Sequence, residues 1–316
     1  TVSFLPGALS GTADCSLVAD AGSESFAISG DGHFVVGAAN SNCLLAWRDG
    51  APQVLDTLSP LGRNGVPIEY ASGMSSDGSV IVGSRDSSNN LPFRAPTFIW
   101  TATTGSYLPP EPIVGSRRAV GSGYVNSDGT IFAFNTLDYA FSSSFGENVN
   151  SGLGYVYRWS AAGSFQEIGR VDASFTMFAR GIDGAGNAIV GLAENPSTFN
   201  DPFGAETRAF VWRAGSGLTT LPDLSSAPPV GTNRYSEANG ISRDGTIIVG
   251  QSRGTDGRLQ AVYWRGRAIT GLGWLPGSSP ADSNPFATNV TQALAANATG
   301  DIIVGKAIGS TTDLAW

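Results

Sequence analysis

The acidic side chains are the groups in this sequence that could do chemistry, because the other common catalytic groups are scarce. The chain has one histidine, His33, and two cysteines, so a Ser-His-Asp triad would have to use His33. That histidine directly follows an Asp-Gly pair, which indicates a surface turn. One histidine and two cysteines also cannot complete a zinc site. We therefore expect no catalytic histidine and no bound metal.

Four aspartates stand at the same place in similar segments, each directly before a glycine. Asp-Gly favours a two-residue β-hairpin turn, because the tight primed turns need positive φ angles. We therefore expect these carboxylates to shape turns and not to bind ligands. They are Asp31, Asp77, Asp128 and Asp244.

Other carboxylates fall in variable segments. Glycan hydrolysis by carboxylates needs two acids across a cleft, and nothing in the sequence pairs any two of these. Loop oxygens at Asn200-Asp201 or Asp282–Asn284 could bind calcium, but no calcium-loop motif supports it, so no cofactor is expected. The acids in the variable segments are Glu147, Glu194, Asp201, Glu206 and Glu237.

An internal repeat positions all these residues. A segment such as 238–250, which reads AlaAsnGlyIleSerArgAspGlyThrIleIleValGly, recurs about every 53 residues, and a short apolar run ending in tryptophan follows each copy. The separations between these tryptophans are 53, 59, 53, 52 and 52 residues. The tryptophans are Trp47, Trp100, Trp159, Trp212, Trp264 and Trp316.

Each repeat contains four strand-like pieces and no amphipathic helix pattern. The second piece is apolar at consecutive positions, as in Ile247 to Val249, which is typical of a strand covered on both faces. The first piece carries small residues, such as Ala238 and Gly240, which permit close backbone approach. A four-stranded unit repeated in this way predicts an all-β fold, a β-propeller of six four-stranded blades.

The two ends of the chain predict how the ring closes. The last repeat stops at Trp316, after its third strand, and residues 2–7 match the fourth strand of the preceding repeat at 272–277. We expect the N-terminal strand to complete the last blade, so that residues 1–316 form one domain. The alternative is that this strand inserts into a neighbouring molecule, giving a swapped oligomer or a filament.

The pattern at this point resembles the probable extracellular repeat known as the HAF family. The resemblance covers essentially the whole chain and is most specific at Ala209 to Trp212. The histidine that precedes Ala-Phe in that family is absent, because Arg208 and Gln260 occupy those places. Such repeats occur in secreted bacterial proteins and in autotransporter passenger regions. The resemblance therefore implies an extracellular location, and it carries no catalytic residues to transfer.

The composition limits the classes of partner that the protein is expected to bind. The net charge is −8 and only 18 residues are Lys or Arg, so binding to nucleic acid or to an anionic membrane is not expected. No apolar run is long enough for a transmembrane helix. No signal peptide precedes the first strand, which is what a mature, processed N-terminus would look like. We expect a protein that is secreted or displayed on the bacterial surface.

Connection lengths divide the blades into two faces. The connections at 84–97, 135–154, 192–207, 222–237 and 276–292 are long and variable, and alternate connections of a blade emerge on one face. Binding residues are common on loops that a rigid scaffold holds. Cys15 and Cys43 both map to this loop-rich face, so we predict a disulfide between them.

Aromatic side chains mixed with Asp, Asn and Arg in these loops are typical of carbohydrate or peptide recognition. The alternative is that the aromatics only anchor their own loops. The predicted binding residues are Tyr139, Phe141, Phe145, Phe199, Asp201, Phe203, Arg234, Tyr235, Asn284 and Phe286.

Three hypotheses for the function follow. The first is an extracellular binding or structural module that presents the loop-rich face to a glycan, a peptide or a protein. The second is a subunit of an extracellular filament. The third is a glycan hydrolase or lyase that uses loop carboxylates. We favour binding over catalysis because no catalytic motif accompanies the repeats.

Overall fold

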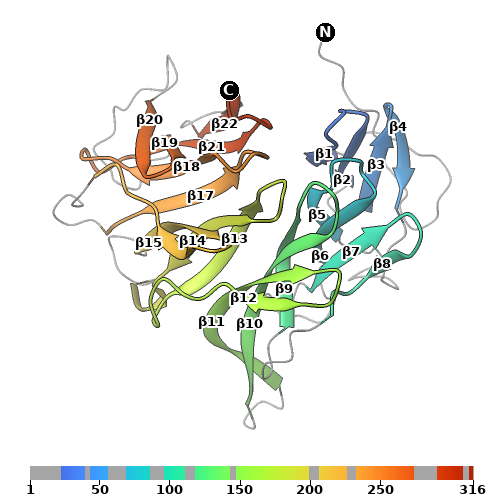
Figure 1. Ribbon diagram of the computed structural model, residues 1–316, viewed down its shortest axis with the longest axis horizontal. Coiled ribbons are helices and arrows are strands. Elements are labelled where there is room, and N and C mark those ends of the chain that lie inside the picture. The colour runs from blue at the N-terminus through green and yellow to red at the C-terminus, as the bar shows by residue number, and fades with distance from the viewer. Residues whose placement is uncertain are drawn as a thin grey trace. The chain divides into compact units, whose positions relative to one another are not determined.

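The computed structural model describes residues 23–39, 43–55, 69–85, 96–110, 118–142, 147–198, 206–225, 233–273, 290–308 and 313–315 (Figure 1). Within these ranges the chain is all-β apart from one 3-10 turn, η1 (Pro196–Thr198). No helix in this part of the chain is long and apolar enough to cross a membrane. The strands are β1 (Ser23–Ile28), β2 (Phe34–Ala39), β3 (Cys43–Arg48), β4 (Ala51–Val54), β5 (Glu69–Met74), β6 (Val80–Arg85), β7 (Thr97–Thr101), β8 (Gly105–Tyr107), β9 (Arg118–Val125), β10 (Ile131–Ser142), β11 (Glu147–Ser160), β12 (Phe165–Glu167), β13 (Thr176–Ile182), β14 (Ala188–Glu194), β15 (Thr207–Arg213), β16 (Gly217–Thr220), β17 (Ser236–Ile241), β18 (Ile247–Arg253), β19 (Leu259–Arg265), β20 (Ala268–Gly273), β21 (Val290–Ala296), β22 (Ile303–Ile308) and β23 (Asp313–Ala315).

Each sequence repeat forms one antiparallel sheet of consecutive strands. Five sheets have four strands, in the orders β1-β2-β3-β4, β5-β6-β7-β8, β9-β10-β11-β12, β13-β14-β15-β16 and β17-β18-β19-β20. The sixth has three strands in the described residues, β21-β22-β23. The predicted all-β fold of four-stranded antiparallel units is confirmed. The N-terminal strand that we expected beside β23 lies outside the described residues, so closure stays a prediction.

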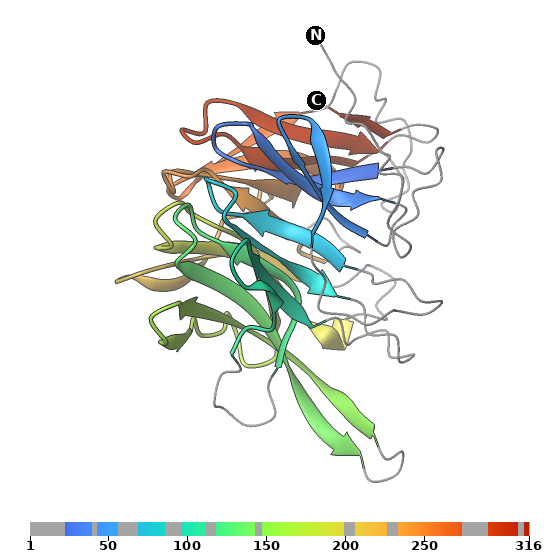
Figure 2. The ribbon, with the colours of Figure 1, turned by 90° about the vertical axis from the view of Figure 1, so that its right-hand side faces the viewer.

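The chain divides into two compact units. Unit 1 comprises Thr1–Ser151 and Tyr157–Gln166, and unit 2 comprises Gly152–Val156 and Glu167–Trp316. Within unit 1, β5 packs against β1 and β2, as the neighbouring blue and cyan strands of Figure 2 show. Within unit 2, β17 packs against β14, and β21 packs against β18. Sheets stacked face to face in this way are the expected arrangement of propeller blades.

The apolar core of each unit lies between neighbouring sheets. In unit 2, Val190 of β14 and Ile248 of β18 belong to one buried cluster with Trp264 of β19. On the other face of β18, Ile247 and Val249 pack with the sheet that begins at β21. Consecutive residues of β18 therefore point to opposite faces, and both faces are covered. This is why the second strand of the repeat is continuously apolar.

The repeated tryptophan lies on the third strand of its sheet in every described case. Trp47, Trp100, Trp159, Trp212 and Trp264 are at most 9% exposed, and Trp316 lies outside the described residues. The Nε1 of Trp264 donates a hydrogen bond to the Pro222 carbonyl of the preceding sheet, at 2.8 Å. The ring thus fills the space between sheets while its one polar atom is satisfied.

The Asp-Gly turns are longer than we predicted. After Ser242, the Gly245 amide donates to the Ser242 carbonyl at 2.9 Å, and the Ser242 amide donates to the Ile247 carbonyl at 2.7 Å. Four residues therefore span this hairpin, and only the glycine has a positive φ, +74°. A two-residue turn of type I′ needs positive φ at both central residues. In the described residues that holds at Asp49-Gly50, with φ values of 50° and 81°.

The glycine that ends the Ile-Val-Gly motif permits a close backbone approach. A Cβ atom placed on Gly250 would lie 1.9 Å from the Glu237 carbonyl oxygen on β17. The register of β17 on β18 shifts between Ala238 and Gly240, which marks a β-bulge. Glycine at this position lets the innermost strand bulge toward its neighbour.

The expected loop at 135–154 is wrong for most of its length. Residues 135–142 continue β10 and residues 147–154 belong to β11, with residues 143–146 outside the described part. The segment around Tyr139 and Phe141 alternates aromatic or apolar residues with polar ones, a strand pattern that we had read as a loop.

Candidate functional site

Strand ends of two neighbouring sheets bring ionisable side chains together in unit 2. Glu194 ends β14 and pairs with Thr176 at the start of β13. Glu237, near the start of β17, pairs with Gln251 near the end of β18. A parallel bridge between Thr207 and Tyr235 joins the ends of the two sheets. We call the resulting group the Glu237 cluster. It comprises Glu194, Tyr235, Glu237, Gln251 and Arg253.

Both carboxylate oxygens of Glu237 accept a hydrogen bond from a neutral donor. The Tyr235 hydroxyl donates to Oε1 at 2.6 Å, and the Gln251 amide Nε2 donates to Oε2 at 3.0 Å. Gln251 is only 2% exposed, and its own Oε1 has no hydrogen-bond partner. Glu237 is therefore held in one orientation, while a buried acceptor beside it is unused.

Tyr235 and Arg253 form the buried side of the cluster. The Arg253 guanidinium carbon lies 5.9 Å from the centroid of the Tyr235 ring, and its Nη1 donates to the Gly257 carbonyl at 2.7 Å. Arg253 is 8% exposed, and its Nε has no hydrogen-bond partner. Burial, together with the charge of Glu237, raises the pKa of Tyr235, so the phenol stays a donor. Burial lowers the pKa of Arg253.

Glu194 differs from Glu237 because its half-buried carboxyl makes no hydrogen bond or ion pair with the described residues. Burial raises the pKa of Glu194, and the negative charge of Glu237 raises it further. The exposed Arg180 of β13 acts in the opposite direction. The two carboxyl groups therefore have different environments: one held by donors, and the other partly desolvated and without them.

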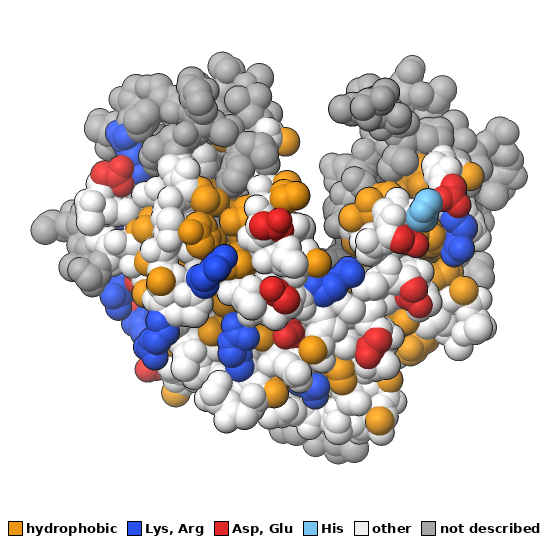
Figure 3. Space-filling model, turned by 45° about the horizontal axis from the view of Figure 1, so that its top comes forward, with side chains coloured by type: hydrophobic (Ala, Val, Ile, Leu, Met, Phe, Trp, Pro, Cys, Tyr) orange, Lys and Arg blue, Asp and Glu red, His pale blue; other side chains and the backbone are white. Residues whose placement is uncertain are grey.

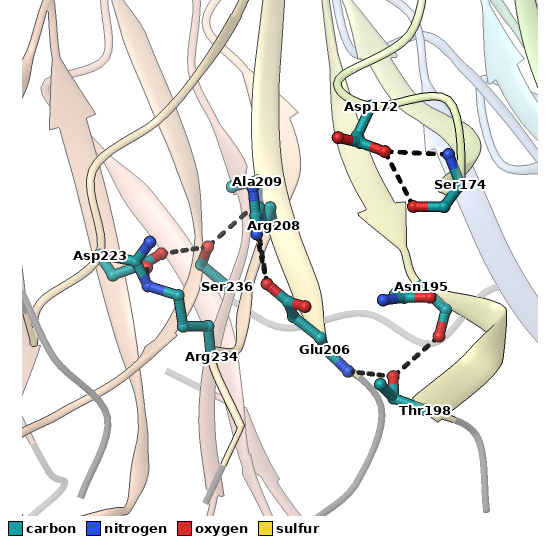
Figure 4. Close-up of polar contacts among 10 residues, drawn as sticks. All are labelled: Asp172, Ser174, Asn195, Thr198, Glu206, Arg208, Ala209, Asp223, Arg234 and Ser236. Carbon is teal, nitrogen blue, oxygen red and sulfur yellow. Dashed lines mark hydrogen bonds and ion pairs between the residues drawn. The ribbon is translucent and has the colours of Figure 1, made fainter.

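A second polar network joins the sheet of β13–β16 to the start of β17 (Figure 4). Arg234 forms an ion pair with Asp223, with Nε 3.2 Å from Oδ2, and 41% of the Arg234 side chain is exposed. The buried Ser236 hydroxyl donates to Asp223 Oδ1 at 2.6 Å and accepts from the Ala209 amide at 3.0 Å. Asp223 thus connects a buried serine to an exposed guanidinium.

The chain before β15 is also held by polar contacts (Figure 4). The Thr198 hydroxyl donates to the Asn195 carbonyl and accepts from the Glu206 amide, both at 2.8 Å. Arg208 Nε donates to Glu206 Oε1 at 3.0 Å. Glu206 therefore has a cationic partner, unlike Glu194.

His33 has a structural environment, as the sequence predicted. It lies at an exposed turn, and its Nδ1 is 2.5 Å from Asp49 Oδ1. The side chain is visible beside acidic groups in Figure 3, where histidine is pale blue. The hydrogen bond and the charge of Asp49 raise the pKa of His33. No group of three His, Cys, Asp or Glu side chains that could hold a metal ion occurs within the described ranges.

Of the predicted binding residues, Tyr235 belongs to the Glu237 cluster, and Arg234, the residue before it, forms its ion pair with Asp223. Tyr139 and Phe141 lie on β10, where only the backbone is described. The others lie outside the described residues, namely Phe145, Phe199, Asp201, Phe203, Asn284 and Phe286. Cys15 also lies outside, and Cys43 begins β3, so the disulfide stays a prediction.

Sequence analysis named Glu194 and Glu237 among five acids but did not pair them. One signal could have helped. Gln251 and Arg253 occupy the places in β18 that Leu192 and Glu194 hold in β14. A polar residue in a strand that is otherwise apolar must find a buried partner, and that partner is Glu237.

Comparison with known proteins supports the fold only. No protein-family model matches the chain, and no curated protein matches it. An oligogalacturonate lyase structure in complex with manganese is similar, with a TM-score of 0.53, 11% identity, and coverage of 92% of this chain and 74% of that one. At that identity the likeness shows a shared fold.

Two further solved structures have lower scores. The β-propeller domain of the trilobed protease from Pyrococcus furiosus has a TM-score of 0.41 and 12% identity, covering 94% of this chain and 95% of that one. TolB from Acinetobacter baumannii has a TM-score of 0.42 and 14% identity, covering 79% of this chain. The match spans about half, 53%, of the TolB chain.

Proposed function

We propose that this chain is a secreted six-bladed β-propeller that binds a glycan through the Glu237 cluster and Arg234. One observation carries the proposal. Buried hydrogen bonds hold polar groups in fixed positions where β14 ends and β17 begins. Glu194 beside them keeps a partly exposed carboxyl group, and the exposed Arg234 directly precedes Tyr235 in the chain. A few fixed polar groups on a rigid scaffold are what a polar ligand requires.

Glycan binding fits the chemistry of these groups better than binding of an apolar ligand. A guanidinium, a carboxylate and a phenol hydroxyl supply both donors and acceptors for sugar hydroxyls. We expect a glycan array to identify a ligand and calorimetry to give its affinity. Arg234→Ala should weaken binding about tenfold or more, because it removes a charged hydrogen-bond donor. The matched control is Arg267→Ala, an exposed arginine in the β19–β20 turn. A protein that binds no glycan, or equal effects of the two variants, would refute the proposal.

Closure of the ring is the second part of the proposal, and an uncovered apolar face supports it. Val304 of β22 is 48% exposed, whereas Val82, Val190 and Val249 at the same place in their sheets are fully buried. The sheet that ends the chain thus has an exposed apolar position where the three sheets that contain Val82, Val190 and Val249 have a buried one. We propose that the first blade covers it and that residues 1–7 supply the missing fourth strand.

Substitution by aspartate tests closure. If the face is covered, Val304→Asp should destabilise the protein by roughly 3 kcal/mol or more, as Val249→Asp should, because both would bury a charge. Leu108→Asp is the control, since Leu108 is 53% exposed. A Val304→Asp effect as small as that of Leu108→Asp would contradict closure. Light scattering would separate closure within one chain, which gives a monomer, from strand exchange in a filament.

Catalysis is a second candidate function, favoured by the two carboxyl environments. A raised pKa on Glu194 and a hydrogen-bonded Glu237 beside it are what a general acid and its partner need in a glycan hydrolase or lyase. Mass spectrometry of any bound glycan after long incubation tests this. Cleavage that Glu194→Gln and Glu237→Gln abolish would establish it, and an intact glycan would leave binding as the function.

A further inference from the structure

Several hydrogen-bond acceptors of the Glu237 cluster have no donor among the described residues, and the buried Nε of Arg253 has no acceptor. Glu237 uses one neutral donor for each carboxylate oxygen. Glu194 has two oxygens and no donor within the described residues, and the deeply buried Gln251 Oε1 has none either. Buried or half-buried acceptors are normally paired, so the described part of the cluster leaves room for donors that a ligand could supply.

The charge balance of the cluster shows what kind of donor is missing. The groups that hold Glu237 are a phenol and an amide, which carry no charge. Arg253 is turned toward Tyr235 and Gly257, and it makes no ion pair with either glutamate. Arg180 is exposed and acts on Glu194 only through its charge. The two carboxylates therefore repel each other, and no cationic side chain of the described residues forms an ion pair with either.

We propose that Glu194 and Glu237 bind a protonated amino group of the ligand. An ammonium group supplies three donors and one positive charge in a small volume, which suits two carboxylates. A divalent cation suits the cluster less well, because calcium takes six to eight oxygens and the cluster offers two carboxylates. The inference rests on the proposed binding function, and it names the chemistry that this site recognises.

The amine could belong to an amino sugar or to a lysine side chain, and matched ligand pairs distinguish the two. We would measure calorimetric affinities for a glucosamine tetramer and for its fully N-acetylated counterpart. A lysine peptide and its acetyl-lysine form make the second pair. Acetylation removes the positive charge and two of the three N–H donors, and it adds a neutral acetyl group. We expect the free amine of at least one pair to bind about tenfold or more tightly than its acetylated form.

Variants assign the preference to Glu194. Glu194→Gln should remove the tenfold preference while binding of the acetylated ligand persists. Glu206→Gln is the matched control, because Glu206 lies nearby but has Arg208 as its partner. An equal affinity for amine and acetylated ligands in both pairs, or a preference that survives Glu194→Gln, would overturn the inference.

Proton release gives a readout that does not depend on the variant's affinity. Binding an ammonium group favours the ionised form of Glu194, whose pKa is raised by burial and by Glu237. At a pH just above the ordinary glutamate pKa, wild-type protein should therefore release protons when it binds the amine. Calorimetry would detect this release as a binding heat that depends on the buffer. Glu194→Gln should lose that release. If neutral glycans bind through Arg234 without any amine preference, this inference fails while the proposed function stands. If no glycan or peptide binds, both fail.

Discussion

Asp244 and Glu237 lie at opposite ends of the same sheet, and their carboxylates serve different purposes. Asp244 accepts bonds from the Ser242 hydroxyl and from the Thr246 amide and hydroxyl, all within its own turn. These bonds, that of Ser242 first, lower the pKa of Asp244. Glu237 instead collects donors from two strands, and its charge helps to raise the pKa of Glu194 in the neighbouring sheet.

The contrast shows how to separate structural from functional acids in a repeat. Equivalent aspartates accept bonds within equivalent turns, as Asp31, Asp77 and Asp128 do. Among the other repeats only the first has a glutamate at the place of Glu237, namely Glu24, and it pairs with Ala38 where Glu237 pairs with Gln251. An acid that recurs with the same donors stabilises the repeated unit, whereas an acid whose donors occur once needs another explanation. Five predictions sharpen this comparison.

The largest effect is expected from Gly250→Ala. The new Cβ would lie 1.9 Å from the Glu237 carbonyl oxygen, so β17 would have to move and Glu237 with it. We expect a loss of about 3 kcal/mol of unfolding free energy in urea, together with loss of ligand binding. Gly181→Ala is the control, because its Cβ would meet Val190 at 3.3 Å and should cost about 1 kcal/mol. Equal costs would show that the close approach is not what matters.

Asp183→Ala tests only the end of the sheet that carries the turn between its first and second strands. Asp183 is 6% exposed, and its Oδ1 accepts bonds from the Asn187 and Ala188 amides at 2.7 and 2.9 Å. Removing it leaves two amides without their acceptor, so we expect a loss of about 1–3 kcal/mol. Ligand affinity should not change, because the turn lies at the other end of the strands. A large loss of affinity in folded protein would break the division between the two ends.

Glu237→Gln should have the opposite result to Asp183→Ala, with a small effect on stability and a large effect on ligand affinity. Glutamine keeps the shape of the side chain but loses the charge, and its NH₂ group would face the hydrogen-bond donor of Tyr235 or Gln251. We expect a change in unfolding free energy of about 1 kcal/mol and a loss of ligand affinity of about tenfold or more. Unchanged affinity by calorimetry would remove Glu237 from the site.

Acid should weaken the turns. Hydrogen bonds within the turns hold the pKa values of Asp31, Asp77, Asp128 and Asp244 below the ordinary aspartate value of 3.8. A lowered pKa contributes stability that is present above 3.8 and is lost as the pH falls through the folded-state value. Urea midpoints should fall steeply in that window, and less steeply for Asp244→Asn. A parallel pH profile for the variant would contradict this role.

Glu194→Gln should have the smallest effect on stability, and in the opposite direction. A raised carboxyl pKa costs stability above the ordinary glutamate value of 4.5, because the folded state disfavours the charge. Glutamine removes that cost, so the melting temperature at neutral pH should rise by about 1–2 °C. The gain should vanish as the pH falls below 4.5. A lower melting temperature would show that the Glu194 charge has a partner.

The repeat period, the four-stranded sheets and the buried tryptophans could be predicted from the sequence. These features rest on local patterns, namely runs of apolar residues and small residues at fixed spacing, with Asp-Gly pairs at the same place in four of the six repeats. Predictions from the same patterns were wrong where the local sequence fitted more than one structure. The Asp-Gly turns span four residues and not two, and the 135–154 segment forms mainly β10 and β11.

The Glu237 cluster required the tertiary structure. Glu194, Tyr235 and Gln251 are separated by sixteen residues or more, and their meeting depends on the packing of β17 against β14. No periodic pattern marks such a group, because Tyr235, Gln251 and Glu194 each occur in one repeat only and the first repeat has a glutamate, Glu24, at the place of Glu237 but alanine, Ala38, at that of Gln251. Sequence repetition therefore determined the scaffold, where every unit obeys the same packing rules. The contact between two particular blades decided which carboxylates share a site, since burial and charge act between side chains that are close in space.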